Sequence, residues 1–215
     1  MSPLVERLEA CYTGAVYDSL RALGRTNQQL PSSIRPLDPS WRLAGPIFTV
    51  SGHAQEGLDA HETLMQWTEV LSRAPSGHVV VCQANDHKLA HMGELSAETL
   101  QLRGIRGYVV DGGCRDTDFI LNIGFRVWCR YLTPADVVGR WVARDLGAPI
   151  QIGEVTIRTG DYLVADRDGA ICVPAELAEE VATTTEQLMT TENLVRAAIR
   201  GGMDPKAAYV QYGAF

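Results

Sequence analysis

The chain has 215 residues, of which 46% are hydrophobic and 21% charged, and its formal net charge at pH 7 is −7. This length and this hydrophobic share suffice for one globular domain with its own core. The acidic balance argues against non-specific binding to nucleic acid or to an anionic membrane, because both need a basic surface. The sequence therefore predicts neither a nucleic-acid partner nor a membrane partner.

The five cysteines are scattered, odd in number and outside any CxxC or CxxH pair. A zinc framework is therefore not expected, and unpaired thiols suit a reducing compartment. The first residues lack the basic and apolar regions of a signal peptide, and no apolar run reaches the roughly 18 residues of a membrane span. A cytoplasmic protein is the resulting expectation.

Hydrophobic periodicity predicts alternating helices and strands in the first half of the chain and mainly strands thereafter. The expected helices cover residues 3–12, 13–23, 61–71, 93–102 and 176–199, with a short one within 205–215. The expected strands cover residues 46–51, 79–82, 108–110 and 125–129, with β-hairpins over 155–173, and residues 25–40 are expected to be a loop. The pattern predicts a mixed α/β layered domain. It spans residues 1–215 and ends in a C-terminal helical extension, residues 175–215.

The helix expected at residues 93–102 opens with Gly93-Glu94-Leu95-Ser96. The first N–H groups of a helix lack intrahelical partners, and together with the helix dipole they favour a carboxylate ligand. Gly93 has no side chain, so a ligand can approach the backbone closely. Glu94 also suits a first helical turn for reasons of dipole alone.

A glycine turn, Gly112-Gly113, follows the strand at 108–110 and presents Arg115 and Asp116 side by side. Arginine offers a planar fork for carboxylates and enolates, and aspartate is a hard oxygen ligand of the kind that Mg²⁺ or Mn²⁺ prefers. An Arg-Asp pair after a glycine turn is also commonly a structural ion pair. The residues alone leave both interpretations open.

The same segment carries a resemblance to a known family. The matching residues are Gly93-Glu94-Leu95, Gly104, Gly107, Val110-Asp111-Gly112 and Arg115-Asp116. They resemble the RraA-like family, which includes class II 4-hydroxy-4-methyl-2-oxoglutarate and 4-carboxy-4-hydroxy-2-oxoadipate aldolases and the regulator of ribonuclease E activity. The aldolases of this family have an acidic residue, twenty further residues and then Arg-Asp. This chain has the same spacing between Glu94 and Arg115, with Glu where the family more often has Asp.

Matches in the right order extend over most of the chain. They include Thr13, Asp18, Leu20 and Gly24, Gly45-Pro46 with Thr49-Val50, Gly160-Asp161, Asp168-Gly169, Val173-Pro174, Glu192 and Arg196. The resemblance implies a layered β/β/α fold of the swivelling phosphohistidine-domain type. It also implies a homotrimer, or a hexamer formed from two trimers, with sites near the subunit interfaces.

The resemblance also implies a role for each site residue. Asp116 would bind the divalent metal, Mg²⁺ or Mn²⁺, and Arg115 would contact the carbonyl or enolate oxygen of an oxo-acid. Glu94 would order metal-bound water, and Glu192 of a neighbouring subunit would complete the site. The carboxylate of the substrate would be held by the backbone amides of Gly93, Glu94, Leu95 and Ser96.

The activity implied is that of a metal-dependent lyase that yields pyruvate from 4-hydroxy-2-oxo acids, with oxaloacetate decarboxylation through the same enolate. The alternative is a regulatory binding protein without chemistry, like the ribonuclease E regulator. The acid-x20-Arg-Asp set favours the enzyme, because a pure binder has no need of all three groups and all three are present here. Methyl transfer to a quinone is not expected, since no glycine loop for S-adenosylmethionine is recognisable.

Several other residues suggest chemistry that the sequence does not support. His53, His61, His87 and His91 show no third metal ligand and are expected to lie at the surface or behind the site. Cys114 has no recognisable triad partner and is expected to behave as a small buried hydrophobic residue. The four tryptophans are expected in the core or at an interface: Trp41, Trp67, Trp128 and Trp141.

Overall fold

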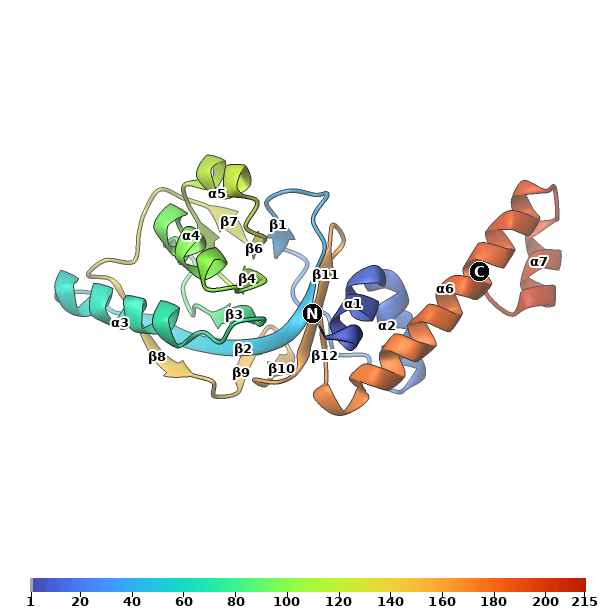
Figure 1. The fold of residues 1–215 in the computed structure, drawn as a ribbon, viewed down its shortest axis with the longest axis horizontal. Helices are drawn as coiled ribbons and strands as arrows, with labels where there is room; N and C mark the ends of the chain where they lie inside the picture. Colours follow the sequence, from blue (N-terminus) through green and yellow to red (C-terminus); the bar gives the residue numbers. More distant parts are fainter. Residues whose placement is uncertain (1) are drawn as a thin grey trace.

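The structure is a computed structural model that describes residues 2–215. Its helices are α1 (Pro3–Ala10), α2 (Thr13–Ala22), α3 (Ala60–Arg73), α4 (Glu94–Leu102), α5 (Thr117–Ile123), the 3₁₀ helix η1 (Ala175–Leu177), α6 (Ala178–Arg200) and α7 (Pro205–Tyr212). Within these residues no helix is both long and apolar enough to cross a membrane. Figure 1 shows α3, α4 and α5 on one side of the molecule and α1, α2 and α6 on the other.

A mixed sheet forms the centre of the fold. Its strands are β1 (Arg35–Pro36), β2 (Leu43–Ala54), β3 (Val79–Gln83), β4 (Gly107–Val110), β6 (Val127–Cys129), β8 (Trp141–Leu146), β11 (Tyr162–Asp166) and β12 (Gly169–Val173). The order is β1-β6-β4-β3-β2-β11-β12, with β2, β3, β4 and β6 parallel to one another. Two small sheets pair β5 (Gly113–Cys114) with β7 (Tyr131–Leu132) and β9 (Ile150–Ile152) with β10 (Val155–Ile157).

The main sheet is nearly closed. The first part of β2 pairs with β11 and its last part pairs with β8, so one long strand serves two neighbours. At the far ends of the order, Arg35 on β1 donates hydrogen bonds to the carbonyls of Arg167 and Asp168 in the turn between β11 and β12. The two edges of the sheet are thereby brought together, which leaves few open strand edges.

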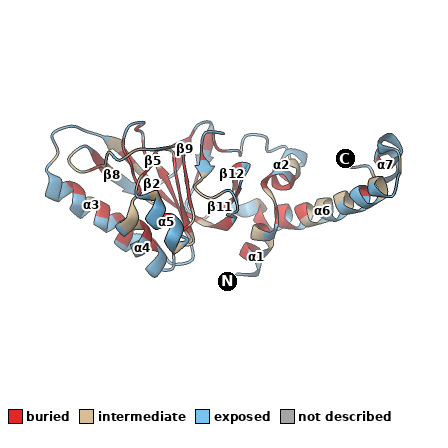
Figure 2. Ribbon diagram, turned by 90° about the horizontal axis from the view of Figure 1, so that it is seen from above, coloured by how far each residue is buried: buried red, intermediate tan, exposed pale blue. Residues whose placement is uncertain are grey.

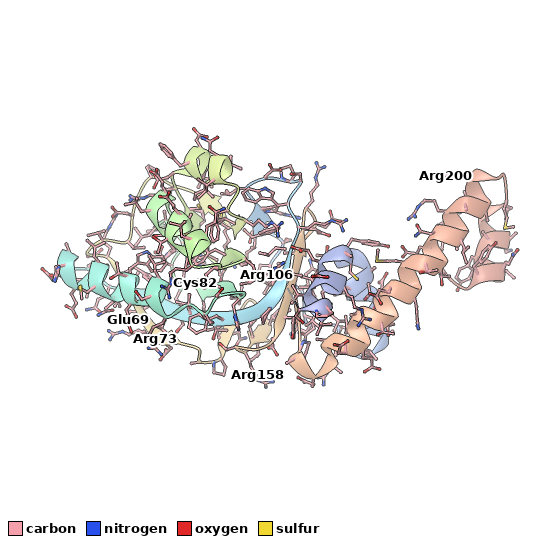
Figure 3. The ribbon with its side chains drawn as sticks, viewed as in Figure 1. Glu69, Arg73, Cys82, Arg106, Arg158 and Arg200 are labelled. Carbon is pink, nitrogen blue, oxygen red and sulfur yellow. The ribbon has the colours of Figure 1, made fainter. Side chains whose placement is uncertain are left out.

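The two faces of the parallel strands are covered differently. On one face, α3, α4 and α5 pack on β2, β3 and β4 through residues such as Trp67, Leu100, Ile120 and Cys82, the last of which is labelled in Figure 3. On the other face, the β9–β10 hairpin and the strands β11 and β12 cover β3 and β4. This arrangement explains why residues 79–82 and 107–110 are apolar without alternation, since both faces are buried.

A third apolar cluster joins α1, α2 and the first half of α6 to the outer face of β11 and β12. The rest of α6 and the whole of α7 extend away from the sheet, as Figures 1 and 2 show. Arg200 at the end of α6 lies far from the sheet (Figure 3). Leu194, Tyr209, Val210 and Phe215 on this projection are exposed.

The structure confirms the mixed α/β class and most of the expected elements. The strand predicted at residues 46–51 is longer in the structure, because β2 reaches from residue 43 to 54, and α5, β8, β9 and the short strands β1, β5 and β7 were not predicted. Trp67, Trp128 and Trp141 are buried as expected, and Trp41 is partly buried against Trp128.

Candidate active site

The start of α4 and the segment after β4 lie side by side. The amide of Arg115 donates to the carbonyl of Met92 (2.9 Å), and the amide of His91 donates to the carbonyl of Gly113 (2.8 Å). Gly113 faces Tyr131 so closely that a Cβ there would lie 2.5 Å from the ring, so the turn needs glycine. This pairing brings together the two stretches that the sequence analysis had singled out.

The Asp116 carboxylate sits at the N-terminus of α4. Its Oδ2 accepts a hydrogen bond from the amide of Glu94 (3.2 Å) and lies 3.3 Å from Nε of Arg115. A Cβ on Gly93 would lie 2.7 Å from the same Oδ2, so the carboxylate occupies the space that the glycine leaves open. Asp116 itself adopts a left-handed backbone conformation (φ 54°), which is uncommon for a non-glycine residue but more frequent for Asp and Asn than for most others.

Arg115 is held by two carboxylates. Besides Asp116, its Nη1 donates to Oδ2 of Asp136 (3.2 Å), a residue that the sequence analysis did not single out. Asp136 in turn accepts from the amide of Val138 and from Nη2 of Arg140 (3.2 Å each). Among the described residues Nη2 of Arg115 has no partner, so this corner of the guanidinium remains available to a ligand.

These groups line one cavity of about 420 Å³. The side chains of Arg115 and Asp116 are each 37% exposed, so they border solvent rather than the closed interior. The cavity is lined by Leu64, Trp67, Thr68, Leu71, Ala90, His91, Met92, Gly93, Glu94, Leu95, Ser96, Thr99, Arg115, Asp116, Asp136, Val137 and Val138. The expected site residues of this chain other than Glu192 are therefore in one place.

The backbone at the start of α4 can receive an anion. The first intrahelical hydrogen bond at the start of α4 is donated by the amide of Ala97 to the carbonyl of Gly93 (3.0 Å). The amides of Leu95 and Ser96 lie before this bond and therefore have no intrahelical acceptor. Such amides, at the positive end of the helix dipole, favour a carboxylate. The hydroxyl of Ser96 accepts from Nε1 of Trp67 (2.8 Å), which fixes α3 against this helix start.

A divalent cation fits this site through Asp116. Oδ2 of this carboxylate is engaged by Glu94 and Arg115, whereas no bond to Oδ1 is found within residues 2–215, so Oδ1 is the atom available to a metal. In that part of the chain no group of three or more His, Cys, Asp or Glu side chains could hold a metal ion. Mg²⁺ commonly keeps several waters and binds one or two carboxylates together with substrate oxygens, and this donor set suits that mode.

Glu192 lies on α6 and outside the cavity. Within its own chain it accepts a hydrogen bond from the hydroxyl of Tyr12, and burial together with this bond raises the pKa of Tyr12 to about 12. Glu192 also borders a second cavity on the projecting part of α6, with Arg196, Arg200 and Phe215. The role that the family resemblance implies for Glu192 would therefore require a second subunit.

His91 and Cys114 are close to the site but are buried. His91 is 1% exposed, and both ring nitrogens lack hydrogen-bond partners among the described residues. Burial lowers the pKa of His91 to about 4, although the Asp86 carboxylate 3.6 Å away opposes this shift, so the ring is neutral at pH 7. His91 was expected at the surface or behind the site, and the structure places it in the buried wall of the cavity. Cys114 is fully buried, as expected, and contact with Cys129 and burial raise its pKa.

Comparison with known proteins gives the family. The profile described as RraA-like, Aldolase/RraA, matches residues 13–172. The chain belongs to the RraA-like family. The resemblance seen in the sequence is thereby confirmed, and the matched region contains the whole Arg115–Asp116 site.

Three similar proteins illustrate the range of the RraA-like family. Protein DlpA of Legionella pneumophila is 27% identical over 99% of this chain, which spans only 34% of that protein. A protein of Halalkalibacterium halodurans named "Putative 4-hydroxy-4-methyl-2-oxoglutarate aldolase" is 28% identical, over 93% of this chain and 90% of its own. A solved structure, Streptomyces coelicolor RraAS2, described as an unusual member of the RNase ES inhibitor RraA family, has 26% identity and a TM-score of 0.81, covering 91% of this chain and 96% of that one.

Proposed function

We propose that the chain is a divalent-metal-dependent carbon–carbon lyase of the class II pyruvate aldolase type, acting on 4-hydroxy-2-oxo acids and on oxaloacetate. One observation carries the proposal. The free corner of the Arg115 guanidinium, the Asp116 carboxylate and the first amides of α4 line the same cavity. A metal-assisted enolate reaction needs a cation, a metal ligand and a carboxylate cradle together.

The reaction follows from where the electrons go. In aldol cleavage the C3–C4 bond breaks, its electron pair stays on C3 and delocalises onto the C2 oxygen, and C4 becomes a carbonyl as its hydroxyl loses a proton. Protonation of C3 then gives pyruvate. In oxaloacetate decarboxylation the same bond breaks and CO₂ leaves, so both reactions share one pyruvate enolate.

Each residue of the site has a separate role in this reaction. Nη2 of Arg115 donates to the C2 oxygen, where negative charge develops, while Asp116 and Asp136 hold the guanidinium in place. The amides of Leu95 and Ser96 bind the C1 carboxylate. Asp116 would hold a divalent cation, Mg²⁺ or Mn²⁺, and that ion would supply Lewis-acid polarisation when bound. Glu94 orders a water in the cavity, and that water or a carboxylate takes the hydroxyl proton.

The assembly belongs to the same proposal. The projecting part of α6 with α7 exposes apolar side chains, including Leu194 and Val210, that a second copy of the chain would cover. A homotrimer or hexamer with the layered β/β/α arrangement of the swivelling type would bring Glu192 of one subunit to the cavity of the next. The helices on one face of the sheet and strands on the other support this layering.

The test measures pyruvate release through lactate dehydrogenase, with oxaloacetate and 4-hydroxy-2-oxo acids as substrates and Mg²⁺ present. Arg115→Ala and Asp116→Ala should each lower turnover by about 10² or more, as for loss of one transition-state stabiliser. EDTA should abolish activity, and Mg²⁺ or Mn²⁺ should restore it. Arg144→Ala, which removes an exposed arginine outside the cavity, is the matched control and should retain activity. Full turnover in metal-stripped protein would refute the metal role.

A second candidate function is a regulatory binding protein without chemistry. The similarity to the Streptomyces coelicolor RraAS2 structure favours it, because that protein is described within an inhibitor family. The same assay separates the two functions. Release of no pyruvate from the whole panel of oxo-acids, with correctly folded protein, would favour the regulator.

A further inference from the structure

Ser96 and Trp67 form a hydrogen bond within the candidate active site. Both residues line the cavity, Ser96 from the first turn of α4 and Trp67 from the neighbouring helix α3 (Figure 1). Nε1 of Trp67 lies 2.8 Å from the hydroxyl oxygen of Ser96. An indole N–H can only donate, so Oγ of Ser96 is the acceptor of this bond. The hydroxyl proton of Ser96 must therefore point in another direction.

The Ser96 proton has no acceptor on its own helix. A helical hydroxyl commonly donates to the carbonyl four residues earlier, and Thr99 does so to the carbonyl of Leu95 (2.7 Å). For Ser96 that carbonyl belongs to Met92, which accepts from the amide of Arg115 instead (2.9 Å). In the part of the chain that the structure describes, Oγ of Ser96 is found to bond only with Trp67. Its proton is therefore available to a ligand in the cavity.

The indole of Trp67 is held in place by the core. Trp67 is only 8% exposed and packs edge-on against Trp141, with the ring centroids 6.1 Å apart. Trp141 is itself buried, and its Nε1 donates to the carbonyl of Ala84 (2.7 Å). Close packing of this kind leaves the indole one orientation, so its N–H is a fixed donor toward Ser96. These contacts lie within one chain and do not depend on how a neighbouring subunit covers the cavity.

The place of this hydroxyl suits a carboxylate. Ser96 also carries one of the two amides at the start of α4, with Leu95, that lack an intrahelical acceptor. The positive end of the helix dipole favours an anion there. A hydroxyl that donates to a carboxylate forms a charge-assisted hydrogen bond, and the bond that it accepts from Trp67 polarises its O–H further. Two amides and one hydroxyl would then converge on the same anion.

We infer that the Ser96 hydroxyl donates to the C1 carboxylate of a bound 2-oxo acid, and that Trp67 is a positioning residue that sets the direction of this donor. The inference rests on the proposed function and adds two side chains to the backbone amides that recognise the carboxylate. Its consequence is specificity for the ionised acid over a neutral amide of the same 2-oxo compound.

The test measures the binding of pyruvate and of its neutral analogue pyruvamide by titration calorimetry, with Mg²⁺ present. Ser96→Ala should raise the Kd of pyruvate by about 10-fold, as for loss of one hydrogen bond to a charged group, and that of pyruvamide by a smaller factor. Thr99→Ala is the matched control. It removes a cavity hydroxyl that is already bonded to the backbone, so the ratio of the two Kd values should stay as in wild type.

Trp67→Phe tests the positioning role, because it removes the indole donor and keeps an aromatic ring. It should raise the Kd of pyruvate by about 3-fold when Ser96 is present. In the Ser96→Ala protein the same change should leave the ratio of the two Kd values unaltered, since no hydroxyl remains to be oriented. A tryptophan that only ties α3 to α4 would lower the melting temperature in both proteins and leave the ratio unaltered in both, which would overturn the positioning role.

The outcomes distinguish this inference from the proposed function. Equal weakening of pyruvate and pyruvamide binding in Ser96→Ala, or no weakening of either, would overturn the inference while leaving the lyase in place. Absence of pyruvate release from every oxo-acid, with pyruvate binding that still depends on the Ser96 hydroxyl, would refute the lyase and leave the carboxylate contact standing.

Discussion

Arg115 shows how one ion pair can serve both structure and chemistry. The sequence left open whether Arg115 and Asp116 form a structural pair or a site, and the structure has features of both: the pair is 3.3 Å apart and also borders the cavity. Exposed pairs of this kind contribute at most about 1 kcal/mol to stability. The ion pairs of Arg115 with Asp116 and Asp136 therefore contribute mainly to the orientation of the guanidinium group.

Asp136 should act as a positioning residue for Arg115. Asp136→Asn removes the charge that faces Nη1 but keeps an oxygen for the amide of Val138, so the loop should stay folded. We expect kcat to fall by about 10-fold with little change in KM, because the interaction lost is one that orients a transition-state donor. The measurement is steady-state pyruvate release.

A second variant and a stability measurement test whether Asp136 acts by positioning Arg115. Asp136→Glu keeps the charge and should recover part of the lost kcat. An effect confined to the melting temperature, with kcat unchanged in Asp136→Asn, would show that the residue only stabilises its loop.

The sequence predicted Arg115, Asp116 and Gly93–Ser96 but not Asp136, and the reason is physical. The first group lies on short motifs whose local chemistry is readable, namely a glycine turn and a helix start. Asp136 reaches Arg115 from 21 residues away. Its position depends on the pairing of the two-residue strands β5 and β7, which are too short to show periodicity.

At the scale of elements, the site depends on how closely α4 begins against the Arg115–Asp116 segment. Gly93 precedes α4 with an extended backbone (φ −147°) that alanine also adopts, so its role is the missing side chain and not backbone strain. Gly93→Ala would place a Cβ 2.7 Å from Oδ2 of Asp116 and 3.2 Å from Nε of Arg115. The carboxylate must then move, since it is the free end of a side chain.

Gly93→Ala should therefore lower activity far more than stability. We expect a loss of 10-fold or more in kcat/KM, with a loss of folding stability of about 1 kcal/mol from the poorer helix cap. Thermal unfolding and pyruvate release measure the two effects separately. The control is Gly14→Ala in α2, where the new Cβ would meet only the Tyr12 ring at 3.4 Å, and it should be active. Equal loss of both properties in Gly93→Ala would contradict the prediction.

The elements that were not predicted from the sequence also have a physical cause in common. β8 pairs with the end of β2, and its six residues are buried only at the start, so they show no alternation. The register shift between Ser51 and Gly52 and the contact of Gly52 with the Trp141 ring are tertiary features that a single strand does not encode. Conversely, β3 and β4 are apolar runs buried on both faces and were predicted correctly.

At the scale of the whole molecule, the projecting α6–α7 segment separates Glu192 from the cavity of its own chain. Glu192 contacts Tyr12 and borders the second cavity, whereas Arg115 lines the first. Sequence and single-chain structure together place Glu192 on a helix with exposed apolar neighbours such as Leu194. The geometry of a subunit interface on this helix would depend on the symmetry of the assembly, which the sequence pattern of one chain does not encode.

Mixed oligomers test whether Glu192 completes a neighbouring site. Arg115→Ala and Glu192→Ala should each be impaired alone, because every site then lacks one group. When the two variants are co-expressed, some sites combine an intact Arg115 with an intact Glu192 of the adjacent subunit. Random assembly in equal amounts would restore roughly a quarter of the wild-type sites, since each condition is met half of the time. Activity of the co-expressed protein no higher than the mean of the two variants would show that Glu192 acts only within its own chain.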